Sequence, residues 1–192
     1  MTAAAKILEI PEVRARISPV TLGQYHQFPE FNVNGRRTEL IRGVVIEKMS
    51  KSPLHSSIGR RLFRLIQSAL PAHFTLLRDD PLTLADSEPE PDLAVVRGAE
   101  SEFTSRHPST AALVIEVAVT SAAADRSQAA LYAEAGVEEY WIVLPVERRV
   151  EIYRQPESGH YRGRFIAEDN AIIECAAVPG ICVKLAELFD AK

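Results

Sequence analysis

The sequence predicts an α/β fold of the mixed α+β kind, in which a mixed β-sheet is flanked by helices. Apolar runs at residues 90–96, 112–119 and 139–144 are typical of buried strands. An alanine-rich segment at residues 127–135 lies between the last two runs and stops at Gly136, as a helix does. Strand, helix and strand at this spacing form a βαβ unit, so the last two strands are expected to be parallel.

Local patterns predict the elements that precede this unit. Thr21 is a typical N-cap for a short helix that stops before Pro29. Apolar and polar residues alternate around Gly43 over residues 37–49, which indicates a bent strand or a hairpin. After Pro53 an amphipathic helix is expected. Its apolar face consists of Ile58, Leu62, Leu65, Ile66 and Ala69.

Shorter patterns complete the expected sheet. Strands are predicted at residues 74–77 and 82–84, on either side of an Asp-Asp-Pro sequence. Residues 150–154 and 161–167 are expected to pair as an antiparallel hairpin across a Ser-Gly turn. A short helix is predicted at residues 185–189.

Composition is that of an ordinary soluble globular protein. Of 192 residues, 46% are hydrophobic and 25% are charged, which is enough to bury one core. No apolar run approaches the roughly 18 residues of a membrane helix, and the first residues lack the apolar stretch of a signal peptide. We therefore expect a cytoplasmic protein without a membrane partner, with an irregular arm over residues 1–20 and a single domain over residues 21–192.

The charge balance excludes a broad basic surface for nucleic acid. The net charge is −4 and the pI is about 5.8, whereas phosphate neutralisation needs clustered lysine and arginine. Nucleic acid would have to be held by a local patch or through metal ions. Arg60, Arg61 and Arg64 on the amphipathic helix could contact phosphates, but such a group is usually a solvated face, and we interpret it so.

Two of the apolar runs carry a single carboxylate each. Asp92 stands at the entry of one predicted strand and Glu116 within the next. An acid in an apolar run is costly to bury as an ion unless it is paired or binds a metal. Carboxylate oxygens suit Mg²⁺ or Mn²⁺, so a divalent-cation site is one interpretation. The other is that Asp92 starts a strand in solvent and Glu116 pairs with an arginine.

Several motifs together resemble the Uma-two family of restriction-endonuclease-like proteins, within the PD-(D/E)XK nuclease superfamily. The likeness runs from about residue 21 to residue 189. It depends on residues 39–43 (ELIRG), Met49 and Ser50 followed by His55, Pro91 with Asp92, residues 114–117 (VIEV) and, above all, residues 131–143 (LYAEAGVEEYWIV).

The resemblance implies a restriction-endonuclease-like fold and a Mg²⁺-dependent (or Mn²⁺-dependent) endonuclease. Asp92 and Glu116 match the metal-ligand positions, and Glu39 matches a further acid near the site, so all three are candidate metal ligands and catalytic residues. His55 matches a family histidine and is a candidate catalytic residue; taken alone, it would be a helix N-terminal or surface histidine. The implied partner is nucleic acid, with DNA expected, and a homodimer is left open.

The chain departs from the superfamily pattern at one position, where a lysine is expected. The lysine usually found two residues after the second acid is Ala118 here. In this family the lysine lies instead on the following helix, after an aspartate and four residues before a tyrosine. Asp125 and Tyr132 are present, but the residue four before Tyr132 is Gln128, which is therefore the candidate catalytic residue. Glutamine can orient a water or contact a phosphate, but it cannot supply positive charge.

Three functions remain open on this evidence. An active endonuclease is favoured by the retained acids. A catalytically inert module of the same fold, binding nucleic acid or protein, is favoured by the absent lysine and the acidic net charge. A structural oligomer that uses an apolar sheet edge at residues 140–144 has no positive signal.

Overall fold

The computed structural model describes residues 7–28 and 37–190. The contacts within the chain divide it into two compact units, each of which is described by itself below. The first unit comprises residues 1–48 and 86–88, and the second comprises residues 49–85 and 89–192. The expectation of an arm followed by one domain stays a prediction.

The first unit holds two short helices and one hairpin. Helix α3 (Leu22–Gln27) begins as predicted: Thr21 Oγ1 accepts from Gln24 N at 3.2 Å, and Thr21 N donates to Gln24 Oε1 at 2.9 Å. This reciprocal pair is a capping box. The predicted hairpin is confirmed as strands β1 (Thr38–Ile41) and β2 (Val44–Glu47), and both turn residues between them have positive φ.

One part of the expected arm is regular. Helix α2 (Pro11–Arg14) lies within it, with proline at its first turn. Proline has no N–H to donate and a φ that suits a helix start, so Pro11 favours this short helix. The prediction that residues 1–20 are irregular throughout is wrong at these four residues.

The second unit is built on a six-stranded mixed sheet in the order β3-β4-β5-β6-β7-β8. Strands β5 and β6 are parallel, as the βαβ unit predicted, and every other neighbouring pair is antiparallel. The predicted mixed sheet flanked by helices is confirmed. The strands are β3 (Phe74–Leu77), β4 (Leu93–Arg97), β5 (Leu113–Val117), β6 (Glu139–Leu144), β7 (Arg149–Glu157) and β8 (His160–Glu168).

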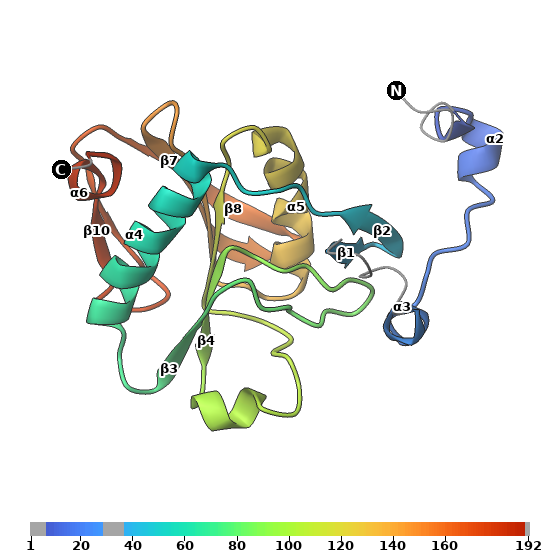
Figure 1. The fold of residues 1–192 in the computed structure, drawn as a ribbon, viewed down its shortest axis with the longest axis horizontal. Coiled ribbons are helices and arrows are strands. Elements are labelled where there is room, and N and C mark those ends of the chain that lie inside the picture. Colours follow the sequence, from blue (N-terminus) through green and yellow to red (C-terminus); the bar gives the residue numbers. More distant parts are fainter. Residues whose placement is uncertain (1–6, 29–36, 191–192) are drawn as a thin grey trace. The chain divides into compact units, whose positions relative to one another are not determined.

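Helices cover both faces of this sheet. On one face, α4 (Pro53–Ala69) and α6 (Leu185–Phe189) pack with the strands, and the small hairpin of β9 (Ile172–Glu174) and β10 (Cys182–Lys184) joins them. On the other face lies α5 (Ala122–Glu134), which connects β5 to β6 (Figure 1).

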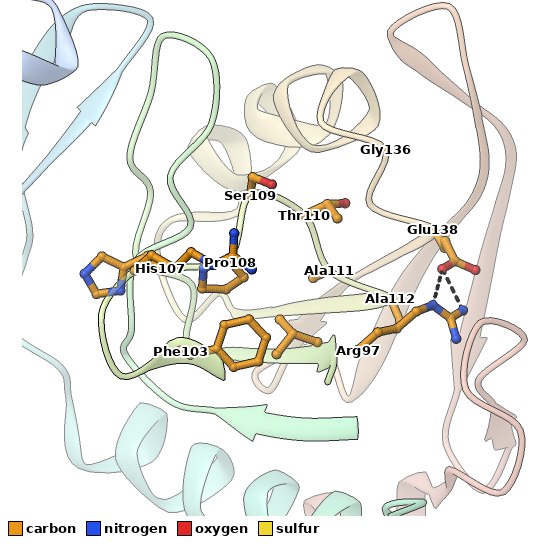
Figure 2. A pocket seen from close by; sticks show the side chains of 12 residues that line it. Arg97, Phe103, His107, Pro108, Ser109, Thr110, Ala111, Ala112, Gly136 and Glu138 are labelled. Carbon is orange, nitrogen blue, oxygen red and sulfur yellow. Dashed lines mark hydrogen bonds and ion pairs between the residues drawn. The ribbon is translucent and has the colours of Figure 1, made fainter. Parts of the chain in front are cut away.

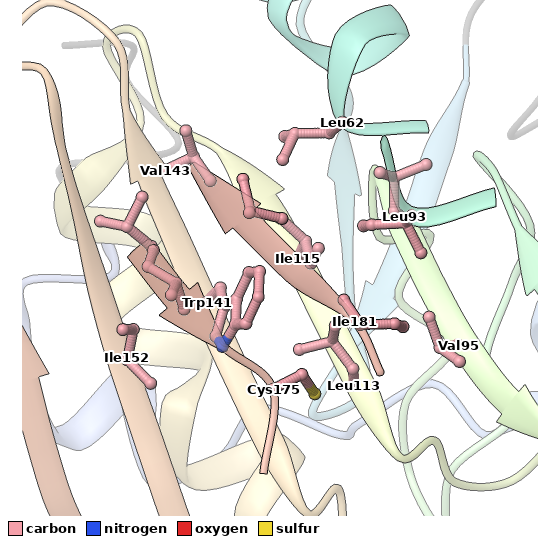
Figure 3. Close-up of a cluster of buried hydrophobic side chains, with 14 of the residues drawn as sticks. Leu62, Leu93, Val95, Leu113, Ile115, Trp141, Val143, Ile152, Cys175 and Ile181 are labelled. Atoms are coloured by element: carbon pink, nitrogen blue, oxygen red, sulfur yellow. The ribbon is translucent and has the colours of Figure 1, made fainter. Parts of the chain in front are cut away.

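The main core lies between α4 and the sheet. Leu62 from α4 meets apolar side chains of the central strands, among them Ile115 and Trp141 (Figure 3). All three are at most 1% exposed. The alternation of inward residues along each strand therefore leaves Glu116, next to Ile115, on the α5 side.

Three sequence predictions need correction, and one element was not predicted. Residues 82–84 are not a strand; Leu82 N donates to the Pro89 carbonyl, because the prolines around this segment interrupt a ladder. Helix α5 begins at Ala122, five residues before the predicted start at residue 127. The hairpin of β9 and β10 was not predicted. Residues 140–144 are not a sheet edge, because β6 pairs on both sides.

Within the described residues, no helix is long and apolar enough to span a membrane.

Candidate functional site

Asp92 and Glu116 face each other across two neighbouring strands. Leu93 pairs with Ile115 in the antiparallel register of β4 and β5, so the next pair outward is Asp92 with Glu116, on the same sheet face. Asp92 N donates to Glu116 Oε2 at 3.2 Å, and Val117 N donates to Asp92 Oδ2 at 2.8 Å. Each acid is thus fixed by the strand that carries the other.

Two cationic or ring nitrogens approach the Asp92 carboxylate. Lys51 Nζ donates to Asp92 Oδ1 at 2.7 Å and also to Asp79 Oδ1. His55 Nε2 lies 2.9 Å from Asp92 Oδ2. Asp92 is 9% exposed, so these contacts compensate a nearly buried charge. We name Asp92 and Glu116, with Lys51 and His55 beside them, the acid site.

Burial and these contacts act in opposite directions on the pKa of Asp92. Burial alone raises it, but the hydrogen bonds and charges of His55 and Lys51 outweigh burial and lower the pKa to about 2. For Lys51 the two effects also oppose each other: burial lowers its pKa, but the hydrogen bonds and charges of Asp79 and Asp92 outweigh burial and raise the pKa above its ordinary value. Asp92 is therefore ionised and Lys51 protonated at neutral pH.

His55 is positioned by the start of α4. Ser52 is the N-cap, its Oγ accepts from His55 N at 3.2 Å, and Pro53 occupies the first helical position. The His55 side chain is 15% exposed. Its Nδ1 is buried and makes no hydrogen bond within the described part of the chain.

Helix α5 carries Tyr132, which contacts Glu116, and Gln128 and Asp125 on the turns before it. Tyr132 Oη donates to Glu116 Oε1 at 3.1 Å. Gln128 lies one turn before Tyr132 on the same helix face, and its Oε1 is buried with no hydrogen-bond partner among the described residues. Asp125 is held one turn earlier, where Ser121 Oγ donates to its Oδ2 at 2.7 Å.

Glu39 belongs to the first unit. It lies on β1, and Lys48 Nζ donates to its Oε1 at 2.7 Å. The structure of the second unit therefore brings together Asp92, Glu116 and His55. Gln128 lies one helical turn from Tyr132, which contacts Glu116, and Glu39 is described only within its own unit.

Sequence reasoning missed Lys51 and Asp79. Both lie in connecting segments without periodicity, so no strand or helix pattern marked them. No signal in the sequence marks either residue; in the folded chain Asp79 has a φ of 56°, which is unusual for a residue other than glycine.

Asp92 and Glu116 are too few to enclose a divalent ion, so an ion held there would have to keep much of its water. No group of three or more His, Cys, Asp and Glu that could hold a metal occurs within residues 7–28 and 37–190. Mg²⁺ often binds through one or two carboxylates and retains several waters. Asp92 and Glu116 supply two carboxylates on one face, and the unpartnered Oε1 of Gln128 is an acceptor suited to such a water.

A separate cavity of about 230 Å³ lies at the other end of β4 and β5 (Figure 2). Phe103, from the short 3-10 helix Glu100–Phe103, and His107 contribute to its lining. Arg97 and Glu138 form an ion pair at its side, 2.8 Å between Nη2 and Oε1. None of the predicted site residues lines this cavity.

Comparison with known proteins identifies the family. The sequence model of the Uma2 (Uma-two) family, described as "putative restriction endonuclease", matches residues 22–186. No curated protein matches the chain. The crystal structure of a putative nuclease belonging to DUF820 from Anabaena variabilis is similar in fold, with a TM-score of 0.73 and 19% sequence identity over 89% of this chain and 98% of that chain. The match over most of its length shows that this chain belongs to the Uma2 family.

Proposed function

We propose that this protein is a divalent-cation-dependent endonuclease that hydrolyses phosphodiester bonds in nucleic acid, with DNA as the expected substrate and Mg²⁺ or Mn²⁺ as the cofactor. Its membership of a family described as "putative restriction endonuclease" supports the reaction class. Nucleases with this fold generally use divalent metal ions. The observation that carries the proposal is the Asp92–Glu116 pair, two acids opposed on neighbouring strands and each bonded to the other's strand.

In this proposal Asp92 and Glu116 hold the ion. An ion bound there would polarise the scissile phosphate and activate a water for in-line attack. Tyr132 orients Glu116 through its hydroxyl, and His55 orients Asp92. The Gln128 amide oxygen accepts a hydrogen bond from a water near the acids. For Glu39 the role of metal ligand stays a prediction.

Lys51 sets a condition on metal binding. Its ammonium already neutralises Asp92 Oδ1, and a divalent ion at the same carboxylate would be repelled by it. We infer that Lys51 turns away from Asp92 when an ion binds, toward Asp79 or the substrate phosphate. Metal binding should therefore be weak.

The alternative is an inert module of the same fold that binds nucleic acid or protein. Two features favour it: Gln128 stands where the resemblance to the family places a lysine, and Lys51 Nζ already donates to Asp92. Removing one hydrogen-bond donor to the charge that develops in a transition state typically costs about 10²–10³ in rate, so a slow nuclease and an inert one must be distinguished by measurement.

Nicking of supercoiled DNA with Mg²⁺, Mn²⁺ or EDTA tests the proposal. Cleavage by the wild type that disappears in EDTA and in both Asp92→Ala and Glu116→Ala is the expected outcome. Calorimetry provides a readout independent of turnover: Mn²⁺ should bind the wild type but not Asp92→Ala, and Glu39→Ala tests the third acid. Equal Mn²⁺ affinity of wild type and Asp92→Ala would exclude this site.

A further inference from the structure

A hollow of about 400 Å³ in the second unit carries four guanidinium groups on its walls. Most of its lining comes from one stretch of α4, and the rest is Arg78, which directly follows β3. We name the lining the arginine hollow; it consists of Ser57, Arg60, Arg61, Phe63, Arg64 and Arg78. No acidic residue is among these six, so the positive charge is not balanced within the hollow.

The four arginines differ in their partners. Arg61 Nη1 donates to the Leu188 carbonyl at 2.8 Å and so helps to hold α6. Arg78 Nε lies 3.7 Å from Asp79 Oδ2. Arg60 and Arg64 are exposed and have no hydrogen-bond or ion-pair partner in the described ranges of the chain. Residues four apart on a helix are neighbours on one face, so these two guanidiniums present a paired, uncompensated charge to solvent.

A run of contacts joins the arginine hollow to the acid site. Arg78 contacts Asp79, Asp79 accepts from Lys51, and Lys51 donates to Asp92. His55, at the acid site, lies on the same helix as the hollow, five residues before Arg60. A chain of phosphates that passes the acid site would therefore meet the hollow on one side.

We propose that the arginine hollow binds the sugar–phosphate backbone of the nucleic acid beside the bond to be cleaved, a role that rests on the proposed nuclease function for its ligand. Guanidinium groups pair with phosphate oxygens in a planar, bidentate way. The net charge of −4 leaves only a local patch for this contact. A merely solvated helix face, which the sequence favoured, does not account for the hollow between α4 and Arg78.

Binding of a labelled DNA duplex, followed by fluorescence anisotropy in EDTA over a range of salt, tests this role. The double variant Arg60→Gln/Arg64→Gln should bind about tenfold more weakly, and its slope of log affinity against log salt should fall by about two, since each phosphate contact contributes about 0.9. Arg162→Gln is the matched control, because Arg162 is an exposed arginine on β8, 3.2 Å from Glu157. Arg61 is left unchanged because it supports α6.

The two proposals fail separately in this design. A double variant with the affinity and salt slope of the wild type, or a wild type that binds no duplex at low salt, would overturn the role of the hollow. Duplex binding that depends on Arg60 and Arg64 supports the role of the arginine hollow. If the wild type binds the duplex in this way but never nicks DNA, only the nuclease function is refuted. An unfolding midpoint temperature equal to that of the wild type would show that the double variant is folded.

Discussion

Lys51 Nζ lies 2.7 Å from Asp92 Oδ1 and binds Asp79 with the same ammonium group. A fixed positive charge thus stands beside the carboxylate that is proposed to hold a metal ion. Unit charges about 4 Å apart interact by about 4 kcal/mol at an effective dielectric constant near 20. A divalent ion at Asp92 would therefore have to compete with this ammonium.

Replacing Lys51 should strengthen metal binding. Lys51→Met keeps the length of the side chain and removes the charge, so we expect Mn²⁺ to bind about tenfold more tightly, or about 1.4 kcal/mol. Isothermal titration calorimetry measures this. Lys184→Met is the matched control, because Lys184 is an exposed lysine bonded to Glu187 at 3.0 Å. An unchanged affinity in Lys51→Met would show that the ammonium does not oppose the ion.

A lysine at position 128 should increase nuclease activity. Gln128 lies one turn before Tyr132, which contacts Glu116, and its buried Oε1 lacks a partner among the described residues. Lysine there adds the positive charge that stabilises the transition state, so Gln128→Lys should raise Mn²⁺-dependent nicking about tenfold or more. Gln67→Lys, at a polar position on α4, controls for an added charge. Loss of nicking in Gln128→Lys, with rapid nicking by the wild type, would identify glutamine as the working residue.

Glu151 should make stability depend on acid pH. Arg126 contacts its Oε1 at 2.7 Å and Arg164 its Oε2 at 2.9 Å. The Arg126 hydrogen bond foremost lowers the pKa of Glu151 from 4.5 to about 2 against the effect of burial, with Tyr153 and Arg164 adding to it. A carboxyl whose pKa is lower in the folded state than in the unfolded state stabilises the folded protein. This contribution is complete at pH values above the unfolded pKa and is lost as the pH falls through the folded pKa.

The free energy of unfolding should therefore fall by about 2–3 kcal/mol from this group as pH drops from about 4.5 to about 2, discounted because both arginines keep part of their hydration. Urea unfolding of wild type and Glu151→Gln over this range, with EDTA present, measures the difference. The variant should give the flatter curve. Parallel curves would mean that Glu151 carries no such linkage.

Glu139 is expected to be the most costly carboxylate to remove. It is fully buried and accepts from Trp141 Nε1 at 2.7 Å, Arg154 Nε at 2.9 Å and Ala176 N at 2.8 Å. Glu139→Ala leaves these donors without an acceptor, so it should lower the free energy of unfolding by about 3–5 kcal/mol, as for other broken buried pairs. Chemical unfolding followed by Trp141 fluorescence measures the loss.

The neighbouring Glu138 supplies the control for that variant. Its carboxylate pairs with Arg97 at 2.8 Å, but the two side chains are 46% and 55% exposed. Exposed ion pairs contribute about 0–1 kcal/mol. A loss in Glu138→Ala as large as that in Glu139→Ala would contradict the assignment of the cost to burial.

The elements predicted correctly are those whose signal is local. Thr21 caps α3 with its own neighbours, the Arg42–Gly43 turn closes β1 on β2, and Gly136 stops α5. The start of α5 was missed although Ser121 is a residue type that often caps helices; in the folded chain its hydroxyl donates to Asp125 and makes no cap. Residues 82–84 have strand composition, but pairing depends on neighbours that only the folded chain supplies.

Only those residues of the acid site that have a local signal could be predicted from the sequence. Asp92 and Glu116 could be recognised because each interrupts an apolar run. Lys51 could not be recognised in this way, because its role depends on a contact with Asp92, which is 41 residues away in the sequence. A lysine in a connecting segment is ordinary in sequence, and only tertiary structure gives it two carboxylate partners.

The contact between α4 and α6 bears on the order in which the protein folds. Arg61 Nη1 meets the Leu188 carbonyl across 127 residues, whereas β6, β7 and β8 pair through short turns. Closing a long loop costs more chain entropy than closing a hairpin, and non-local pairing slows folding. In pulse-labelled hydrogen exchange, amides of β7 should gain protection before those of α4; the reverse order would contradict this. Since His55 lies on α4, the acid site would be assembled only in the last stage of folding, and partly folded chains would not bind metal.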